Sequence, residues 1–139
     1  MSSATALYTP AVLGLATSLA NYPLGEDLPL RAAARAPLCG STIELGLALD
    51  EAGRISAIGL KSHACAIGQA AAALFAGAAP GKDRADLAAT LAGLEAWLND
   101  GAAPLPDWPG LDAIVAARSY PARHGAILLP WKAALAALP

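Results

Sequence analysis

The sequence of 139 residues contains few cysteines, histidines, aromatic residues and charged residues, and these shortages exclude several classes of protein. Two cysteines are too few for a disulfide framework, so we expect a reducing compartment, the cytoplasm. Only 14% of the residues are charged and no cluster of Lys and Arg occurs, so we expect no nucleic-acid binding. No run of about 18 strongly apolar residues is found, and no signal peptide is recognisable. We therefore expect no membrane association.

What the chain has in abundance is apolar sequence, which makes up 56% of it and is rich in alanine. At this length the chain is most simply one domain over residues 1–139, large enough to bury a core. The carboxylates are scattered, and neither a close pair for acid–base chemistry nor a glycine-rich phosphate loop is present. We therefore do not expect an enzyme.

The clearest structural signal is an alternation of apolar residues between positions 42 and 63. Apolar side chains occupy every second position from 43 to 49, residues 50–53 have the composition of a turn, and Ile58 and Leu60 resume the alternation. This pattern predicts a β-hairpin, and residues 30–37 are compatible with a further short strand. We expect a small antiparallel sheet of about three strands.

Helical patterns surround these strands. Helices are predicted from Pro10 to about residue 21, over residues 66–76, after Asp83, over residues 111–117, and at the end of the chain, where Pro130 starts or kinks the last helix. The predicted fold is α+β, with helices packed on one face of the small antiparallel sheet.

Cys39 lies just before the first strand of the hairpin and Cys65 just after the second, so we expect the two thiols to meet at its open end. Cys65 also precedes the helix predicted for residues 66–76. The positive end of a helix dipole and its free N–H groups favour a thiolate, the form that binds metal or attacks an electrophile. The alternative is that Cys65 is a buried, inert cysteine.

The two histidines are the remaining soft ligands. His63 is two residues before Cys65, which would place both on one face of a strand, and His124 begins the last segment. A set of Cys39, Cys65, His63 and His124 would bind zinc and could hold iron. Alternatively, His63 is an exposed residue at a strand end and His124 caps a helix. Arg123 is expected to pair with a carboxylate or a carbonyl.

The stretch "APLCGSTIELGLALDEAGRISAIGLKSHACAIGQAAAAL" resembles the first two cysteine motifs of the iron–sulfur cluster assembly scaffold family, the U-type scaffolds of the Isc, Nif and Suf systems. "LYTPAVLGLATSLANYPLG" is similar to the family's N-terminal helix and loop. "LDAIVAARSYPARHGAILLPWKAAL" is similar to its Tyr-Pro-x-Arg segment and last helix. The resemblance is to the NifU-like and SufU-like branch.

The chain departs from the family at three positions near the cysteines. Ser41 stands where the family has an aspartate, Ala126 where it has its third cysteine, and His63 where it usually has a glycine. The resemblance therefore leaves two of four family site positions, Cys39 and Cys65. Whether His63 or His124 replaces the missing cysteine stays open.

The resemblance implies a function in iron–sulfur cluster assembly together with a cysteine desulfurase or other assembly proteins. The chain would bind iron or zinc, carry a [2Fe–2S] cluster, or accept sulfur, at a site built on Cys39 and Cys65. Two alternatives stay open: a divergent paralogue that binds or regulates a desulfurase or assembly complex, and a redox switch made of the two thiols.

Overall fold

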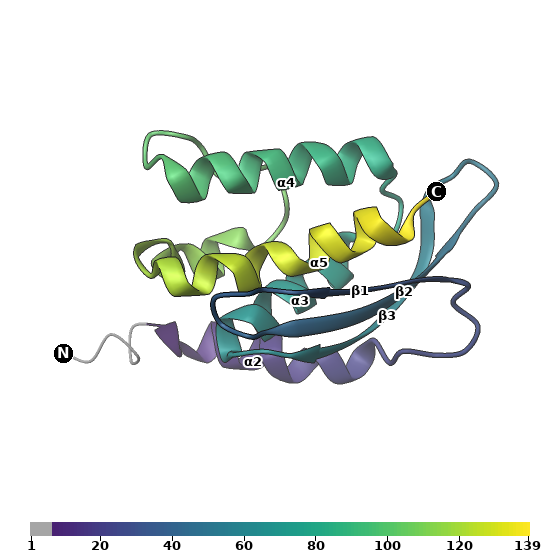
Figure 1. Cartoon of the computed structure of the whole chain (residues 1–139), viewed down its shortest axis with the longest axis horizontal. Coiled ribbons are helices and arrows are strands. Elements are labelled where there is room, and N and C mark those ends of the chain that lie inside the picture. Colours follow the sequence, from purple (N-terminus) through teal and green to yellow (C-terminus); the bar gives the residue numbers. More distant parts are fainter. Residues whose placement is uncertain (1–6) are drawn as a thin grey trace.

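The sheet and helices of the chain form separate layers in a computed structural model, which describes residues 7–139 (Figure 1). The sheet has three antiparallel strands in the spatial order β1-β2-β3, so each strand lies beside its neighbour in sequence. The strands are β1 (Leu30–Arg35), β2 (Thr42–Leu49) and β3 (Ile55–His63). This arrangement confirms the predicted α+β fold, including the short first strand and the hairpin.

The hairpin of β2 and β3 is closed by the turn that the sequence predicts. Its Asp50 carboxylate accepts hydrogen bonds from the backbone N–H groups of Ala52 and Arg54, at 2.9 and 3.0 Å. Gly53 has a φ of +80°, which other residues rarely adopt. At the open end of the hairpin Thr42 pairs with His63. The segment that precedes Thr42 and the segment that follows His63 therefore lie side by side where they join the sheet.

The two faces of the sheet are covered differently. The inner face presents buried Ile43, Leu45 and Leu47 to the helices. On the outer face the chain crosses the sheet at Gly59, where any Cβ atom would overlap the Pro23 carbonyl. This crossing covers only the middle of the outer face, because the next outward positions of β2 and β3 toward the open end of the hairpin are exposed.

The helices cover the inner face in two tiers. Helix α5 packs against β1, β2, α3 and α4, while α3 also packs against α2. In Figure 1, α4 lies on the side of α5 away from the sheet. The bounds of the helical elements are α2 (Pro10–Ser18), η1 (Leu19–Asn21), α3 (Ala66–Ala78), α4 (Arg84–Asn99), η2 (Leu111–Ser119), η3 (Pro121–Arg123) and α5 (His124–Ala137).

Three aromatic side chains form the centre of the helical core. Phe75 of α3 and Trp108 are stacked, with ring centroids 5.6 Å apart, and Trp131 of α5 stands edge-on to both. The Trp108 indole N–H donates to the Leu74 carbonyl at 2.8 Å, which satisfies it although it is buried. These contacts join α3, α5 and the loop before η2, so large side chains far apart in sequence hold the helical layer together.

The short helix predicted over residues 111–117 is present as a 3₁₀ helix over residues 111–119, a tighter form common in short connecting segments. The last helix does not start at Pro130, one of the two predicted alternatives, because α5 begins at His124 and continues through this residue. Pro130 is buried against the core, so packing compensates for the backbone hydrogen bond that proline cannot donate. Among residues 7–139, none of the helices has the length and hydropathy needed to span a membrane.

Candidate functional site

Cys39 lies in the loop of residues 36–41 between β1 and β2, which we call the Cys39 loop. Ala36 N donates to the Ser41 carbonyl, and Gly40 N donates to the Ala36 carbonyl, both at 2.8 Å. Gly40 has a φ of +70°, so the tight return of the chain depends on glycine. The loop therefore holds half-exposed Cys39 in a defined position, beside Leu38, whose side chain is 87% exposed.

The surroundings of Cys39 favour its thiolate. Its Sγ atom is 3.1 Å from the hydroxyl oxygen of Ser41, a residue that is itself buried. Burial raises the pKa of the Cys39 thiol, but hydrogen bonds from the Ser41 hydroxyl and backbone outweigh it, together with the charge of Arg123, and the pKa is lowered. An ionised aspartate at this position would repel a thiolate, whereas the Ser41 hydroxyl can donate to it.

Cys65 occupies the N-cap of α3, as the sequence predicts. Its backbone is extended, with φ −63° and ψ 169°, and its carbonyl accepts the first helical hydrogen bond, from Gln69 N at 3.0 Å. Its half-exposed thiol makes no capping hydrogen bond. Because β3 ends at His63, the alternation of a strand does not extend to Cys65, and the interpretation that the two share a strand face is wrong.

The first turn of α5 lies between the two cysteine segments. A Cβ atom on Gly68, in the first turn of α3, would be 3.1 Å from the Ala126 Cβ atom. A Cβ atom on Gly125 would be 3.1 Å from the Ala36 Cβ atom, at the start of the Cys39 loop. Ala126, which the resemblance places at the family's third cysteine, is therefore next to the helix that Cys65 caps. It is also one residue from contact with the Cys39 loop. Its side chain is a buried methyl group.

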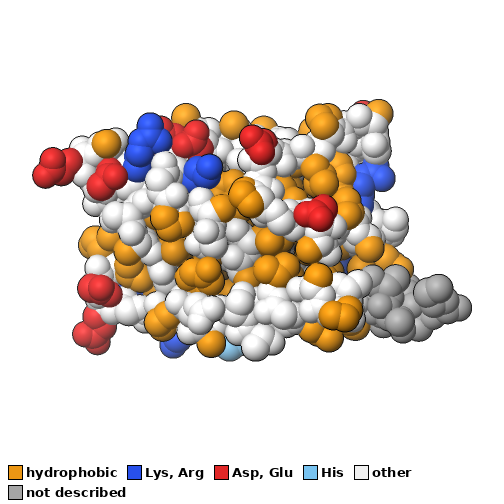
Figure 2. Space-filling model, turned by 180° about the vertical axis from the view of Figure 1, so that it is seen from behind, with side chains coloured by type: hydrophobic (Ala, Val, Ile, Leu, Met, Phe, Trp, Pro, Cys, Tyr) orange, Lys and Arg blue, Asp and Glu red, His pale blue; other side chains and the backbone are white. Residues whose placement is uncertain are grey.

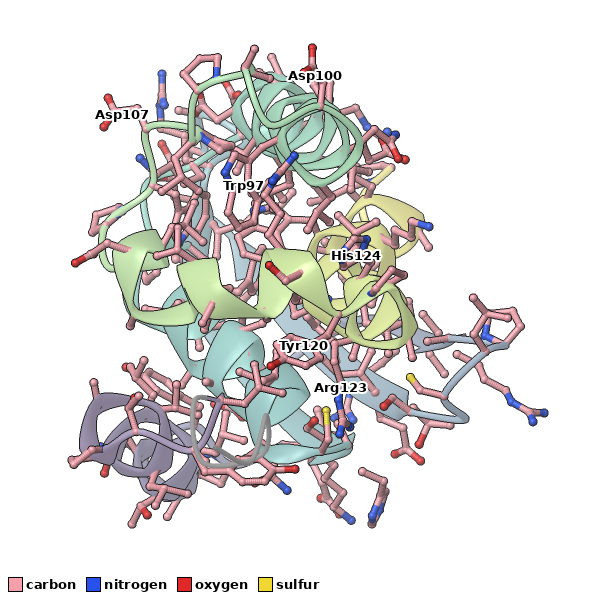
Figure 3. The ribbon with its side chains drawn as sticks, turned by 90° about the vertical axis from the view of Figure 1, so that its left-hand side faces the viewer. Trp97, Asp100, Asp107, Tyr120, Arg123 and His124 are labelled. Atoms are coloured by element: carbon pink, nitrogen blue, oxygen red, sulfur yellow. The ribbon has the colours of Figure 1, made fainter. Side chains whose placement is uncertain are left out.

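The two histidines lie in different surroundings. The His124 Nε2 atom is 2.7 Å from the Arg118 carbonyl oxygen, and Arg118 Nε donates to the Trp97 carbonyl, also at 2.7 Å. These bonds connect α4, η2 and the start of α5. Figure 3 shows His124 on the side toward α4 and its neighbour Arg123 on the side away from it. His63 is exposed at the end of β3.

Within residues 7–139, no three His, Cys, Asp or Glu side chains lie close enough together to hold a metal ion. The cysteines are free of a disulfide. The described residues therefore do not fit a closed four-ligand zinc site, and the ligand roles of His63 and His124 stay predictions. A metal or cluster at this end would be cargo with two protein thiols and further ligands from elsewhere.

Sequence reasoning did not anticipate the roles of Ser41, Arg123 and Leu38. Arg123 was expected to pair with a carboxylate or a carbonyl, but its side chain makes neither bond in the described part of the chain and instead acts on Cys39 by its charge. The signal for Ser41 was its place two residues after Cys39. The exposure of Leu38 could not be read from the sequence, where apolar residues usually indicate core.

A groove elsewhere on the surface does not belong to this site. It has a volume of about 450 Å³ and lies between α4 and residues 103–108. Its lining includes Lys82, Asp86 and Trp108 but neither cysteine and neither histidine. The two cysteines and this groove are therefore in different places.

Comparison with known proteins identifies the fold. No protein-family model and no curated protein matches the sequence. The N-terminal part of a NifU-like nitrogen-fixation protein from Brucella abortus superposes with a TM-score of 0.85 at 23% identity, covering 98% of this chain and 94% of that one. This chain has the U-type scaffold fold.

Two further solved structures share this fold. A SufU from Fervidobacterium islandicum AW-1, assigned as an iron–sulfur cluster assembly scaffold for the SUF system, has a TM-score of 0.81 at 20% identity, covering 96% of this chain and 98% of that one. A hypothetical protein has a TM-score of 0.63 at 20% identity, covering 91% and 95%. The U-type fold thus extends over nearly the whole chain.

Proposed function

We propose that this protein is a divergent U-type scaffold of iron–sulfur cluster assembly, whose site is built on Cys39 and Cys65. The observation that carries the proposal is the placement of both cysteine segments, and of the Ala126 position, around one end of a U-type fold. The fold alone would leave the function open. The two thiols kept at this end connect it to iron and sulfur chemistry.

The two thiols lie in different surroundings. The Cys39 thiolate is supported by Ser41 and Arg123, and Cys65 stands at the start of α3. Thiolates are the preferred protein ligands of zinc and of iron–sulfur clusters, each of which takes four donors per metal. Cys39 and Cys65 would supply two of these donors. Inorganic sulfide, a partner protein or the predicted ligands His63 and His124 would supply the others.

Sulfur acceptance is the second reaction open to the same thiols. A thiolate of Cys39 or Cys65 would attack the outer sulfur of a persulfide on a cysteine desulfurase. The new S–S bond forms as the donor S–S bond breaks, and the donor leaves as a thiolate, so no external oxidant or reductant is needed. In this proposal the desulfurase is the partner and the cytoplasm the place of action.

A second candidate is favoured by one observation, the buried methyl group of Ala126 in place of a third thiol. A chain that has lost this ligand could bind a desulfurase or an assembly complex and regulate it without carrying a cluster. This candidate predicts that Cys39→Ser and Cys65→Ser leave partner binding intact and have no effect on the assembly rate of the complex.

The test of the proposal is the metal content of protein purified without a histidine tag under anaerobic conditions, measured by mass spectrometry. We expect bound iron or zinc, or uptake of iron with sulfide, that is lost in Cys39→Ser and in Cys65→Ser. Loss in His63→Ala or His124→Ala as well would establish the larger ligand set. Protein that contains no metal and takes up neither zinc nor iron with sulfide would contradict the proposal.

A further inference from the structure

The thiol end of the molecule, formed by Cys39, Cys65 and the first turn of α5, has fewer donors than a metal needs. Zinc takes four ligands, and a [2Fe–2S] cluster takes four thiolates besides its own sulfides. Cys39 and Cys65 would supply two of them, and Ala126 brings only a methyl group to this end. Within residues 7–139 no third His, Cys, Asp or Glu lies close enough to join them. Two ligand positions are therefore left for donors from outside the described chain.

The basic side chains of the chain divide into two groups by their contacts. Five of the nine Lys and Arg residues are engaged within the chain, four through hydrogen bonds and Lys82 over the Trp108 ring. The engaged residues are Arg31, Arg54, Lys82, Arg84 and Arg118. In residues 7–139 the side chains of the others make no hydrogen bond or ion pair: Arg35, Lys61, Arg123 and Lys132.

Two of these unengaged cations extend from the sheet beside the thiol end. Arg35 ends β1, directly before the Cys39 loop, and lies in one row across the sheet with His63. Lys61 lies in the next row on the same face, paired with Glu44. All four positions are exposed, whereas Ile43 between the two rows is buried, so these side chains belong to the outer face.

A third cation reaches the thiol end from the helical layer. Arg123 ends η3, two residues before Gly125, which packs against Ala36 at the start of the Cys39 loop. Figure 3 shows the Arg123 side chain pointing toward the part of the molecule that holds the sulfur atoms. Its charge acts on Cys39. The only ion pair among the described residues, Arg54 with Asp86, involves none of these three cations.

This gathering of positive charge is local. The chain as a whole has a net charge of −2, and Glu44 is the one acidic residue in the two rows of the sheet. Figure 2 shows the face opposite that of Figure 1, where acidic side chains lie along the margins and hydrophobic ones are scattered. Unpaired cations gathered at one end of an acidic protein favour an anionic ligand there.

The outer face also has space for a small molecule next to these cations. A recess of about 410 Å³ is lined in part by Arg35, Thr42 and Glu44. Thr42 directly follows Ser41, whose hydroxyl oxygen is 3.1 Å from the Cys39 sulfur, so the recess adjoins the thiol end. Its volume is within the range of sites that bind small ligands.

We propose that the thiol end binds a low-molecular-weight thiol that carries carboxylates, of the glutathione type, an inference that rests on the proposed function. The carboxylates bind to Arg35, Lys61 and Arg123, and the sulfur becomes the third thiolate on the metal beside Cys39 and Cys65. Guanidinium groups bind carboxylates through paired, charge-assisted hydrogen bonds. The thiol loses its proton to solvent as the metal–sulfur bond forms, so no oxidant or reductant takes part. Water or sulfide fills the fourth position.

A second copy of the chain is the other source of thiolates. Its two cysteines would complete four sulfur ligands, but its Arg35, Lys61 and Arg123 would face the same three cations of the first copy. Like charges brought together in this way repel, whereas the carboxylates of glutathione neutralise them. The charges therefore favour the small thiol, and the mass of the complex distinguishes the two sources.

Binding of the small thiol is tested on reduced, Zn²⁺-loaded protein by calorimetric titration with glutathione under anaerobic conditions. Two matched probes separate its functional groups. Glutathione diethyl ester keeps the thiol without the carboxylate charges, and S-methylglutathione keeps the carboxylates without a thiol. We expect glutathione to bind about tenfold more tightly than either probe, because exposed charge contacts each contribute a factor of a few. Equal affinities of glutathione and its diester would overturn the proposal.

The cations are tested by neutralisation. Arg35→Gln, Lys61→Gln and Arg123→Gln should each weaken the binding of glutathione, relative to that of its diester, by about two- to fivefold. The comparison with the diester removes any effect that acts through the metal, such as the influence of Arg123 on Cys39. Lys132→Gln is the matched control, because Lys132 is the remaining unengaged cation and lies in α5. Equal effects of all four variants would contradict a localised site.

The same samples separate this inference from the proposed function. If zinc binds and is lost in Cys39→Ser and Cys65→Ser, but glutathione has no advantage over its diester, the scaffold function stands and the thiol site is wrong. If no metal binds with or without glutathione, the proposed function fails and the inference fails with it. Native mass spectrometry should show one chain with zinc and glutathione. Zinc held between two chains would identify the second copy as the source and overturn the proposal.

Discussion

Helices α3 and α5 pack against each other, but the side chains at the two ends of their contact differ greatly in size. In the first turns of the two helices, Gly68 lies against Ala126, and both residues are small. Farther along, Phe75 and Trp131 meet edge to face at 5.2 Å. The small end adjoins both cysteine segments, and the large end adjoins only core.

This difference separates the residues that hold the fold from those that serve the site. The aromatic end contains the largest fully buried side chains, Phe75 and Trp131, so the packing of the two helices does not depend on a large side chain at position 126. At the small end the backbones of the two helices approach closely. The first turn of α5 therefore lies against both α3 and the Cys39 loop. A third cysteine can therefore be replaced by Ala126 without loss of the U-type fold, which agrees with a TM-score of 0.85 at 23% identity.

The largest effect is expected at the aromatic end. Trp131→Ala should lower the free energy of unfolding by about 3–5 kcal/mol, since it empties a fully buried site against the Phe75 and Trp108 rings. Leu38→Ala, at an exposed position, should change it by less than about 0.5 kcal/mol. Urea unfolding followed by circular dichroism measures both. Similar losses of stability in the two variants would contradict the distinction between residues that hold the fold and residues near the site.

At the small end, adding a single methyl group should be harmful. Gly68→Ala should lower the free energy of unfolding by about 1–3 kcal/mol, because its Cβ atom would lie 2.7 Å from Ala64 Cβ and 3.1 Å from Ala126 Cβ. Gly14→Ala is the matched change, in α2 with nothing within 4 Å of the new atom, and should raise stability by about 0.5–1 kcal/mol. The same unfolding experiment distinguishes them, and a stabilising Gly68→Ala would refute the tight contact.

Restoring a thiol at the small end should strengthen metal binding. Ala126→Cys would add a third sulfur beside the Cys65 helix, and we expect about tenfold tighter zinc binding, measured by competition with a chromophoric chelator. Ala70→Cys is the control, because Ala70 is equally buried in α3 but a turn away from the α3 start. If both variants bind zinc like wild type, the Ala126 position does not face the two cysteines.

The smallest expected effect concerns protonation of Cys39. Its pKa is lowered, so in a Cys65→Ser background alkylation by iodoacetamide should rise with pH at lower values than for an ordinary cysteine. Ser41→Ala and Arg123→Gln should each move the midpoint toward higher pH, because each removes a group that favours the thiolate. Unchanged midpoints in both variants would show that these groups do not act on the thiol.

Local patterns predicted most of the fold. The alternation of β2 and β3, the turn at Asp50 and the helix after Asp83 each depend on neighbours in sequence, and the structure confirms them. The 3₁₀ form of η2 and the passage of α5 through Pro130 were not predicted, because packing against distant elements decides them.

For the site, the sequence placed Cys65 at a helix start and both cysteine segments at one end of the hairpin. It could not give the orientation of His124, because the Arg118 carbonyl that bonds this ring lies in η2 and is positioned by the contact of Arg118 with α4. Nor could it distinguish Leu38, at the tip of a loop, from the leucines of the core.

The central claim is that Cys39 and Cys65 act as one site. The most direct measurement is the alkylation of each cysteine, resolved by peptide mass spectrometry, as Zn²⁺ or Fe²⁺ is added to the reduced protein. We predict that both thiols become protected together, at the same metal concentration, and that Cys39→Ser removes the protection of Cys65. Protection of only one thiol, or of neither, would contradict the account.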